Sequence, residues 1–417
     1  MKPPRREFLK QVFTAAGGLS LPLAAQVPPA RTAGNERKVF PHPAFFSGRE
    51  DLPEDLFGDV ALMRKGGPSM TMGSGPTSIA PITSRQEWAV KATALRQIFQ
   101  LMLGTAPLNN TPLSIRLEGE KDRGEIVERR VSYLLSPGER VTSLLLLPKK
   151  RARPLPALLT IHPTAAEGKE QTVGRGESAN GQLTPAAARR AYGWELAQRG
   201  FITFSPDLLG AGERAYPGRR SFDNQPFIDA HPHWSGTGKD LHDLQRALDV
   251  MQTMPEIDPT RIGSIGHSQG AGLTCYLAAV DDRIRVGVAN CGVWPSRLRE
   301  NPFHLARTGW WTGQPNLRPF CAAGKPLPID SHELLALAAP RPFLNIVALN
   351  DCGFGPEDET LTRPAWENLA LNVRKIYALH DAAADFQNVV HLDGHDFHDP
   401  MRTHAYQFLE QKLLSQG

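Results

Sequence analysis

The sequence has few cysteines, no basic block and no long hydrophobic run after its N-terminal segment. Its four cysteines, Cys275, Cys291, Cys321 and Cys352, are too few and too scattered for a disulfide scaffold or a Cys-x-x-Cys metal site. After residue 25 no stretch of 18 apolar residues occurs, so no membrane span is expected once the N-terminal segment is removed. The net charge of +4 is modest, which argues against a nucleic-acid partner.

The N-terminal segment MKPPRREFLKQVFTAAGGLSLPLAAQ has the layout of a cleavable export signal: a basic head, a weakly apolar stretch and small residues at its end. The pair Arg5-Arg6, followed by Phe-Leu-Lys, resembles the twin-arginine signal that an export receptor reads. We therefore predict a signal peptide over 1–25, the twin-arginine export machinery as a partner, and a periplasmic or secreted bacterial protein. The alternative is a basic amphipathic helix.

The remaining chain is long and apolar enough, at 417 residues and 41% apolar, to bury a large core. Residues 26–83 are rich in Pro, Gly, Ser and Arg and predict an irregular arm. Helical spacing of apolar residues then predicts a helix between Ser84 and Gly104, and two β-type runs around Ser136-Pro137-Gly138 predict a hairpin.

From Pro156 onward, short apolar runs alternate with helical segments, which predicts an α/β fold: a mostly parallel, doubly wound sheet with helices on both faces. The helices are expected at 186–199, 239–254 and 269–280, and a last one begins near Met401. The whole catalytic domain is expected to span 84–417. Residues 293–332 exceed an ordinary connection and predict an insertion, with its own helices, over the active site.

The pentapeptide Gly266-His267-Ser268-Gln269-Gly270 follows a short predicted strand and precedes a predicted helix. A serine on such a turn is typical of a nucleophile elbow, where Gly266 and Gly270 allow the chain to turn without side-chain clashes. A dinucleotide-binding turn requires G-x-G-x-x-G, and the glycines here stand in the wrong register. We therefore predict that Ser268 is a nucleophile.

A nucleophilic serine needs a base, and the base needs an acid that orients it. Asp351 ends a predicted strand, and His395 lies on the loop after the last strand, in the order serine, acid, histidine expected after such an elbow. The rivals are His391, expected to end the strand facing the core, and His398, expected on the surface. The acids Glu357, Asp358 and Glu359 compete with Asp351 but are typical of a solvated loop.

The same chemistry needs N–H donors for the developing oxyanion. The N–H of Gln269, directly after the nucleophile, is one candidate. The second is expected after the strand LLTIHPT, where Pro163 has no N–H, so Thr164 is the candidate. His162 is then expected to support this loop.

From about residue 85 to the C-terminus, the chain resembles α/β-hydrolases of the dienelactone hydrolase and acetyl xylan esterase-like group, particularly secreted bacterial members. The stretches DPTRIGSIGHSQGAG and LALAAPRPFLNIVALND carry the resemblance most specifically. It implies an α/β-hydrolase fold, the triad Ser268, Asp351 and His395, and an oxyanion hole from Gln269 and Thr164. Dienelactone hydrolases use cysteine where this chain has Ser268, which favours ordinary carboxylic esters, including acetyl groups on polysaccharides.

Several other residues carry separate hypotheses. Asp207 with Glu213-Arg214 is expected to form a structural ion pair. His231 and His233 lack a third ligand at zinc-like spacing. Cys291 and Cys352 are expected to follow neighbouring strands, which would permit a disulfide. The tryptophans Trp234, Trp310 and Trp311 are expected in the core or the pocket wall, where one could stack on a sugar ring.

The sequence thus predicts a secreted serine esterase that acts through an acyl-enzyme on a small-molecule or carbohydrate ester, with no metal or organic cofactor. One alternative is a serine peptidase of the prolyl oligopeptidase type, although the region before Pro154 is too short for its β-propeller. Another is a non-catalytic exported binding protein on the same scaffold, although all three triad residues are present.

Overall fold

The computed structural model describes residues 79, 81–150, 154–175, 185–295, 305–306, 311–318, 329–351 and 363–415. The expected signal segment 1–25 and almost all of the arm 26–83 lie outside these residues, as do Trp310, Cys321, Cys352 and the acids 357–359. All described residues fall in the second of the two units into which the chain divides, residues 39–417. Among the described helices, none is long and apolar enough to cross a bilayer.

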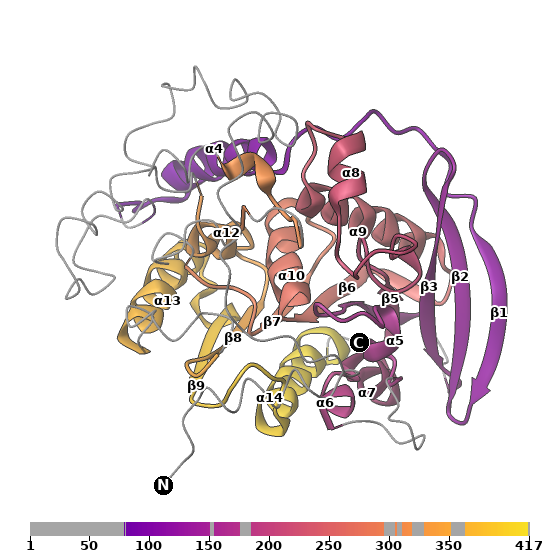
Figure 1. Cartoon of the computed structure of the whole chain (residues 1–417). Helices are drawn as coiled ribbons and strands as arrows, with labels where there is room; N and C mark the ends of the chain where they lie inside the picture. Colours follow the sequence, from indigo (N-terminus) through magenta and orange to yellow (C-terminus); the bar gives the residue numbers. More distant parts are fainter. Residues whose placement is uncertain are drawn as a thin grey trace, which may run out of the picture. The chain divides into compact units, whose positions relative to one another are not determined.

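A nine-stranded mixed sheet runs through this unit (Figure 1). Its order is β1-β2-β3-β5-β4-β6-β7-β8-β9; the first three pairings are antiparallel and the remaining five are parallel. The strands are β1 Arg116–Arg123, β2 Ile126–Ser136, β3 Glu139–Pro148, β4 Leu155–Ile161, β5 Ile202–Pro206, β6 Ile257–His267, β7 Val286–Asn290, β8 Phe343–Ala348 and β9 Phe386–His391. This confirms the predicted α/β fold with a mostly parallel sheet.

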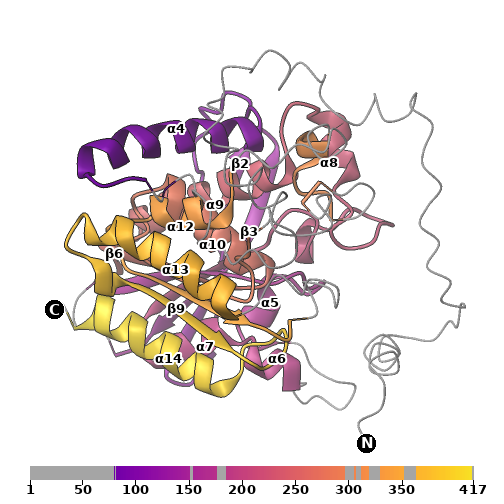
Figure 2. The ribbon, with the colours of Figure 1, turned by 90° about the vertical axis from the view of Figure 1, so that its left-hand side faces the viewer.

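Helices cover both faces of the sheet, as predicted (Figures 1 and 2). One face carries α9 Gly236–Thr253, α10 Gln269–Val280, α12 Ser331–Leu337 and α13 Arg363–Ala378, with α4 Arg85–Leu103 outside them. The other carries α7 Tyr192–Gln198 and α14 Asp399–Leu409. Shorter elements are α5 Lys169–Thr172, α6 Pro185–Arg189, α8 Gln225–Ala230, the 3-10 turns Gly212–Arg214, Pro315–Leu317 and Ala383–Asp385, and the π-helical turn Glu410–Leu414.

Successive apolar side chains of the central strands point to opposite faces of the sheet, which explains why helices are needed on both faces. In β4, Ala157, Leu159 and Ile161 belong to the core on the α10 side, whereas Leu158 belongs to the core on the α14 side. Successive side chains of a strand point to opposite faces. Both faces are therefore apolar, and both must be covered by helices.

Side-chain caps decide where two of the helices begin. Ser84 and Glu87 form a reciprocal capping box at the start of α4, which ends at Gly104, where the backbone φ is +86°. Helix α9 begins at Gly236, three residues before its predicted start, because the Ser235 side chain accepts a hydrogen bond from Gly238 N–H.

Two elements differ from the sequence-based expectation. The helix expected over 186–199 is split into α6 and α7, and Ala191 precedes α7 with a non-helical ψ of 32°. Helix α7 packs against α5 so closely that a Cβ on Gly193 would lie 2.8 Å from the carbonyl oxygen of Thr172. Strand β1 was not predicted, because its sequence RLEGEKDR has no apolar alternation.

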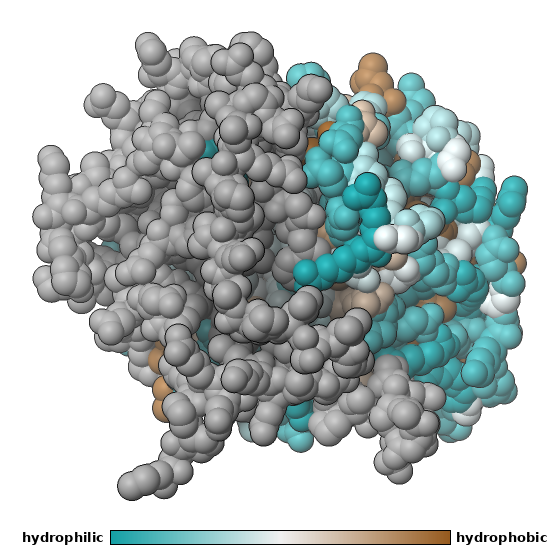
Figure 3. Space-filling view, viewed as in Figure 1, coloured by the Kyte–Doolittle hydropathy of each residue, from teal (hydrophilic) through white to brown (hydrophobic). Residues whose placement is uncertain are grey.

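The composition of β1 suits its place at the edge of the sheet. Seven of its eight residues are exposed, and six are charged. Charged side chains on an edge strand disfavour pairing with another chain. In the space-filling view, the described surface over β1–β3 is mostly hydrophilic (Figure 3).

A buried ion cluster ties the loop after β4 to the loop after β5. Lys169 Nζ lies 2.5 Å from Asp207 Oδ2, and both side chains are only 1% exposed. Asp207 Oδ1 also accepts the Lys169 N–H, and Glu213 lies 3.1 Å from Lys169 Nζ. The ion pair expected for Asp207, Glu213 and Arg214 is thus a larger network, in which Lys169 is the direct partner of Asp207.

Replacing Lys169 by methionine is expected to lower the free energy of unfolding by about 3–5 kcal/mol, because a buried carboxylate left without its partner is strongly unfavourable. Urea denaturation of the purified protein measures the change. Lys149→Met is the matched control: its partner Asp122 is 71% exposed, so the urea midpoint should stay the same. Equal midpoints for both variants would contradict the prediction.

Candidate functional site

Ser268 lies on a tight turn between β6 and α10, in the context that the sequence predicted. Its backbone has φ 57° and ψ −120°, a region that side-chain-bearing residues rarely adopt. The surroundings leave no room for side chains: a Cβ on Gly270 would lie 2.1 Å from the carbonyl oxygen of Ile161, and one on Gly266 would lie 2.2 Å from the backbone of Gly270. The two predicted glycines are therefore sterically required for this turn.

The structure brings together the three residues predicted as a triad. His395 Nε2 lies 2.9 Å from Ser268 Oγ, and His395 Nδ1 lies 2.7 Å from Asp351 Oδ2. Ser268 follows β6, Asp351 follows β8 and His395 follows β9, so all three lie beyond the carboxyl ends of parallel strands. This is where ligands bind in open α/β sheets.

The hydrogen bonds determine which nitrogen of His395 carries the proton. An ionised Asp351 only accepts hydrogen bonds, so Nδ1 must donate to it. Nε2 is then the acceptor for the Ser268 hydroxyl. The Asp351 side chain is fully buried and that of His395 is 20% exposed, so the acid is shielded from water while the imidazole remains accessible. The arrangement can remove a proton from Ser268.

The loop that carries His395 is held on both sides. Phe397 is fully buried and contacts Tyr192 and His267 through its ring. Asp396 forms an ion pair with Arg189 at 2.5 Å. The rival His391 ends β9 and is 8% exposed, which agrees with its predicted place.

His398 is half-buried and precedes α14. It was predicted at the surface at the start of this helix, and the structure places it there with part of its ring covered. Among the described residues, no hydrogen bond joins it to Ser268 or Asp351.

His267 packs against the proposed base, a contact that the sequence did not reveal. Its ring centroid lies 4.9 Å from that of His395. Burial, and secondly the proximity of His395, hold the pKa of His267 well below its usual range, so this ring is neutral. Asn290 Nδ2 donates to His267 Nδ1 at 2.8 Å and to the carbonyl oxygen of Asp396 at 3.2 Å, which joins β7 to the His395 loop.

The two candidate oxyanion donors lie on facing loops. Gln269 is the first residue of α10, and Thr164 follows β4; their side chains are hydrogen-bonded, Thr164 Oγ1 donating to Gln269 Oε1 at 3.0 Å. Within the described residues, the backbone N–H groups of Gln269 and Thr164 donate no hydrogen bond. His162 supports the loop, as predicted: it is fully buried and its Nε2 accepts the Leu208 N–H.

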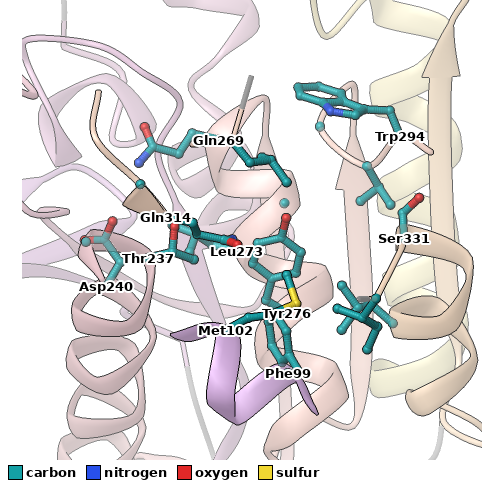
Figure 4. A pocket seen from close by; sticks show the side chains of 18 of the residues that line it. Phe99, Met102, Thr237, Asp240, Gln269, Leu273, Tyr276, Trp294, Gln314 and Ser331 are labelled. Carbon is teal, nitrogen blue, oxygen red and sulfur yellow. The ribbon is translucent and has the colours of Figure 1, made fainter. Parts of the chain in front are cut away.

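A pocket opens at Ser268 and has two unlike walls (Figure 4). Its mainly apolar wall is formed by Phe99, Met102, Leu273, Tyr276, Val293 and Trp294, and the polar residues Asp330 and Ser331 also line the pocket. Its polar wall is formed by Asn224, Thr237, Asp240, Gln269 and Gln314. In the described part of the chain, Asn224 Oδ1 and Gln314 Oε1 are buried and accept no hydrogen bond. Asn224 Oδ1 faces Gly210, and a Cβ on that glycine would lie 2.3 Å from it.

Asp240 is the charged group of the polar wall. It is 3% exposed, and its Oδ1 accepts the Leu209 N–H at 2.8 Å. Burial raises the pKa of Asp240 to about 7, because desolvation penalises the carboxylate more than Leu209 and Arg214 stabilise it. No sequence signal distinguished Asp240 from the other acids of α9; only the fold turns it toward the pocket.

The tryptophans and cysteines that the sequence analysis singled out lie in different parts of the structure. Trp311 lines the pocket, whereas Trp234 packs with Leu209 and Phe227 in a separate apolar cluster. Cys275 and Cys291 are buried free thiols, and Cys352 lies outside the described residues. Over the described ranges, no cluster of three or more His, Cys, Asp or Glu could hold a metal ion.

Residues 76–293, a little more than half of the chain, match the model of the Abhydrolase family. The chain belongs to the Abhydrolase family. The matched region includes Ser268 and Thr164 but ends before Asp351 and His395.

Curated relatives extend the likeness. The Bacillus subtilis (strain 168) protein named "Putative hydrolase YtaP" is 27% identical over 327 residues, which are 78% of this chain and 100% of that protein. "Carbohydrate esterase MZ0003", from an unknown prokaryotic organism, is 26% identical over 203 residues, 47% of this chain and 46% of that protein.

Solved structures share the fold of this Abhydrolase family member. A glucuronoyl esterase from Solibacter usitatus has a TM-score of 0.59 at 18% identity, with 80% of this chain and 94% of that chain covered. A promiscuous CE15 esterase from a marine bacterial metagenome also has a TM-score of 0.59 at 18% identity, covering 83% and 96%. The α/β-hydrolase fold predicted from the sequence is confirmed.

The raised pKa of Asp240 predicts a pH-dependent stability difference between the wild type and Asp240→Asn. Between about pH 4 and pH 7 the folded wild type binds the proton and the unfolded chain does not, so this group makes the wild type less stable as pH rises. The asparagine does not titrate and keeps the acceptor for Leu209 N–H.

The difference in unfolding free energy, variant minus wild type, should therefore rise by up to about 1.4 kcal/mol per pH unit in this range and level off above pH 7. Urea denaturation at several pH values measures it. A difference independent of pH, or one that falls from pH 4 to pH 7, would contradict the prediction.

Proposed function

We propose that this Abhydrolase family member is a serine esterase that hydrolyses carboxylic esters through an acyl-enzyme. The single observation that carries the proposal is the position of His395, whose two ring nitrogens lie 2.9 Å from Ser268 Oγ and 2.7 Å from Asp351 Oδ2. A nucleophile, a base within hydrogen-bond reach and an acid that orients the base are the parts this chemistry requires.

In the proposed reaction, His395 Nε2 takes the proton of Ser268 as Oγ attacks the ester carbonyl carbon. The resulting imidazolium is stabilised by Asp351 and returns the proton to the leaving alcohol as the carbon–oxygen bond breaks. His395 then removes a proton from water, whose oxygen attacks the acyl carbon. The bond between that carbon and Ser268 Oγ breaks, His395 returns the proton to Oγ, and the carboxylic acid is released. The N–H groups of Gln269 and Thr164 are proposed to stabilise the two tetrahedral oxyanions.

We propose carbohydrate esters as the substrate class. The two-sided pocket supports this: aromatic and aliphatic side chains suit the apolar face of a sugar ring, and the polar side chains of Thr237, Gln269 and Gln314 line the other wall, where sugar hydroxyl groups would lie. The names of relatives agree, since a carbohydrate esterase and glucuronoyl esterases are among them. Hydrolysis assays with acetylated xylan, aryl acetates and glucuronoyl esters would identify the acyl group that the protein removes.

Ser268→Ala is expected to lower the turnover of p-nitrophenyl acetate by about 10³-fold or more, because the covalent step is lost while the fold is retained. A fluorophosphonate probe should label Ser268 in the wild type, detected by peptide mass mapping, and should leave the variant unlabelled. The matched control is His398→Gln on the His395 loop, which should keep wild-type turnover, whereas His395→Gln should not. Substantial activity in Ser268→Ala would reject the proposal.

We also propose the domain organisation that the sequence predicted, with residues 1–25 as a twin-arginine signal, 26–83 as an arm and 84–417 as the catalytic domain. The pair Arg5-Arg6 in a basic N-terminal segment supports export.

Replacing Arg5-Arg6 by two lysines keeps the charge and is expected to retain the full chain in the cytoplasm of an expressing bacterium, because the receptor reads the arginine pair. Cell fractionation with an esterase assay measures this. Lys10→Arg is the control that should still be exported. Unchanged export of the double-lysine variant would show that the twin-arginine route is not used.

A further inference from the structure

The side chain of Gln269 joins three segments that lie far apart in the sequence. Its Oε1 accepts a hydrogen bond from Thr164 Oγ1 at 3.0 Å and another from Trp311 Nε1 at 2.9 Å. Thr164 lies on the loop after β4, Gln269 begins α10, and Trp311 belongs to the long segment between β7 and α12. We call this group of three side chains the Gln269 clamp.

The chemistry of the donors determines how the Gln269 amide is oriented. An indole N–H can only donate, so the atom that faces Trp311 must be the amide oxygen. The Thr164 hydroxyl donates to the same oxygen and occupies its second lone pair. The amide nitrogen is therefore turned away from both partners, and in Figure 4 it lies on the side of Gln314.

Trp311 is itself firmly placed. Its backbone φ is 51°, and its N–H donates to the carbonyl oxygen of Phe222, a residue whose φ is 63°. Residues other than glycine adopt a positive φ at a cost in energy, so Trp311 and Phe222 keep this conformation only because the surrounding structure holds them. The next residues are attached too, because the carbonyl oxygen of Gly313 accepts the Thr237 N–H at the start of α9.

Thr164, in contrast, has little other support for its side chain. It is exposed, and among the described residues its hydroxyl makes no other hydrogen bond. The adjoining Pro163 and the buried His162 anchor the base of the loop, so the clamp acts at its free end. The bond between Thr164 and Gln269 therefore joins the two loops that supply the proposed oxyanion donors.

We propose that Gln269, through its side chain, is a positioning residue that sets the separation of the two oxyanion N–H groups, with Trp311 as the anchor. The inference rests on the proposed function, because it needs an oxyanion at this site. Donors to a developing charge must be held in place before the reaction, and a displacement of a fraction of an ångström weakens them. The clamp is expected to act on turnover rather than on substrate binding.

Gln269→Met tests the clamp, since methionine has a similar length, removes both accepted hydrogen bonds and keeps the backbone N–H. With p-nitrophenyl acetate, kcat should fall about tenfold while KM stays within about twofold and the thermal midpoint is retained. Thr164→Val should lower kcat to a similar degree, whereas Thr164→Ser, which keeps the hydroxyl, should restore it. The double variant Thr164→Val with Gln269→Met should be no slower than either single one.

The outcomes separate this inference from the proposed function. If Ser268→Ala is inactive but Gln269→Met and Thr164→Val keep wild-type kcat, the clamp is wrong and the esterase proposal stands. If kcat falls only together with the thermal midpoint, or if Thr164→Ser is as slow as Thr164→Val, the residues support the fold alone and the clamp is again rejected. If Ser268→Ala retains activity, both proposals fail.

Discussion

The absence of side chains around the turn at Ser268 is the constraint on which the site depends. Backbone atoms of Gly270 and Ile161, and of Gly292 and Ser268, approach so closely that a Cβ on either glycine would lie about 2 Å from a carbonyl oxygen. This contact lets the end of β6 turn sharply into α10 beside the ends of β4 and β7. It also presents Ser268 Oγ above the sheet, within reach of a histidine from β9.

Around this turn, the fold assembles groups from separate strands by a simple rule. Parallel strands end at the same edge of the sheet, so the loops after β4, β6, β8 and β9 meet there even though they are far apart in sequence. Ion pairs then hold these loops: the buried pair of Lys169 and Asp207 joins the loops after β4 and β5, and the partly exposed pair of Arg189 and Asp396 holds the loop of His395. The proposed chemistry relies on this rigidity, because its donors and its base must be in place before the ester arrives.

Much of the architecture could be predicted because it follows local rules. The boundaries of α4, the hairpin of β2 and β3, and the helix after Ser268 follow from caps, turn residues and periodicity. The elements that were not predicted correctly also have local causes. Strand β1 carries charged residues on both faces, so its sequence lacks the apolar alternation that predicts a strand. Helices α6 and α7 are separated at Ala191, whose backbone is not helical, and α7 packs closely against α5. Asp240 carried no motif that would single it out as a pocket residue, whereas Trp311 was one of three tryptophans expected in the core or the pocket wall.

The sequence by itself determined the class of the fold and the turn that carries Ser268, and it indicated which acids and histidines could serve beside this serine, because these depend on residue type, order and position relative to strand ends. Only the tertiary structure decided which histidine reaches Ser268, since His391, His395 and His398 differ by a few residues on one loop. It also decided the polar wall, where burial raises the pKa of Asp240, and the contact between Thr164, Gln269 and Trp311. Distances across the sheet and the loss of hydration on burial arise only when distant segments pack together, and no local pattern contains them.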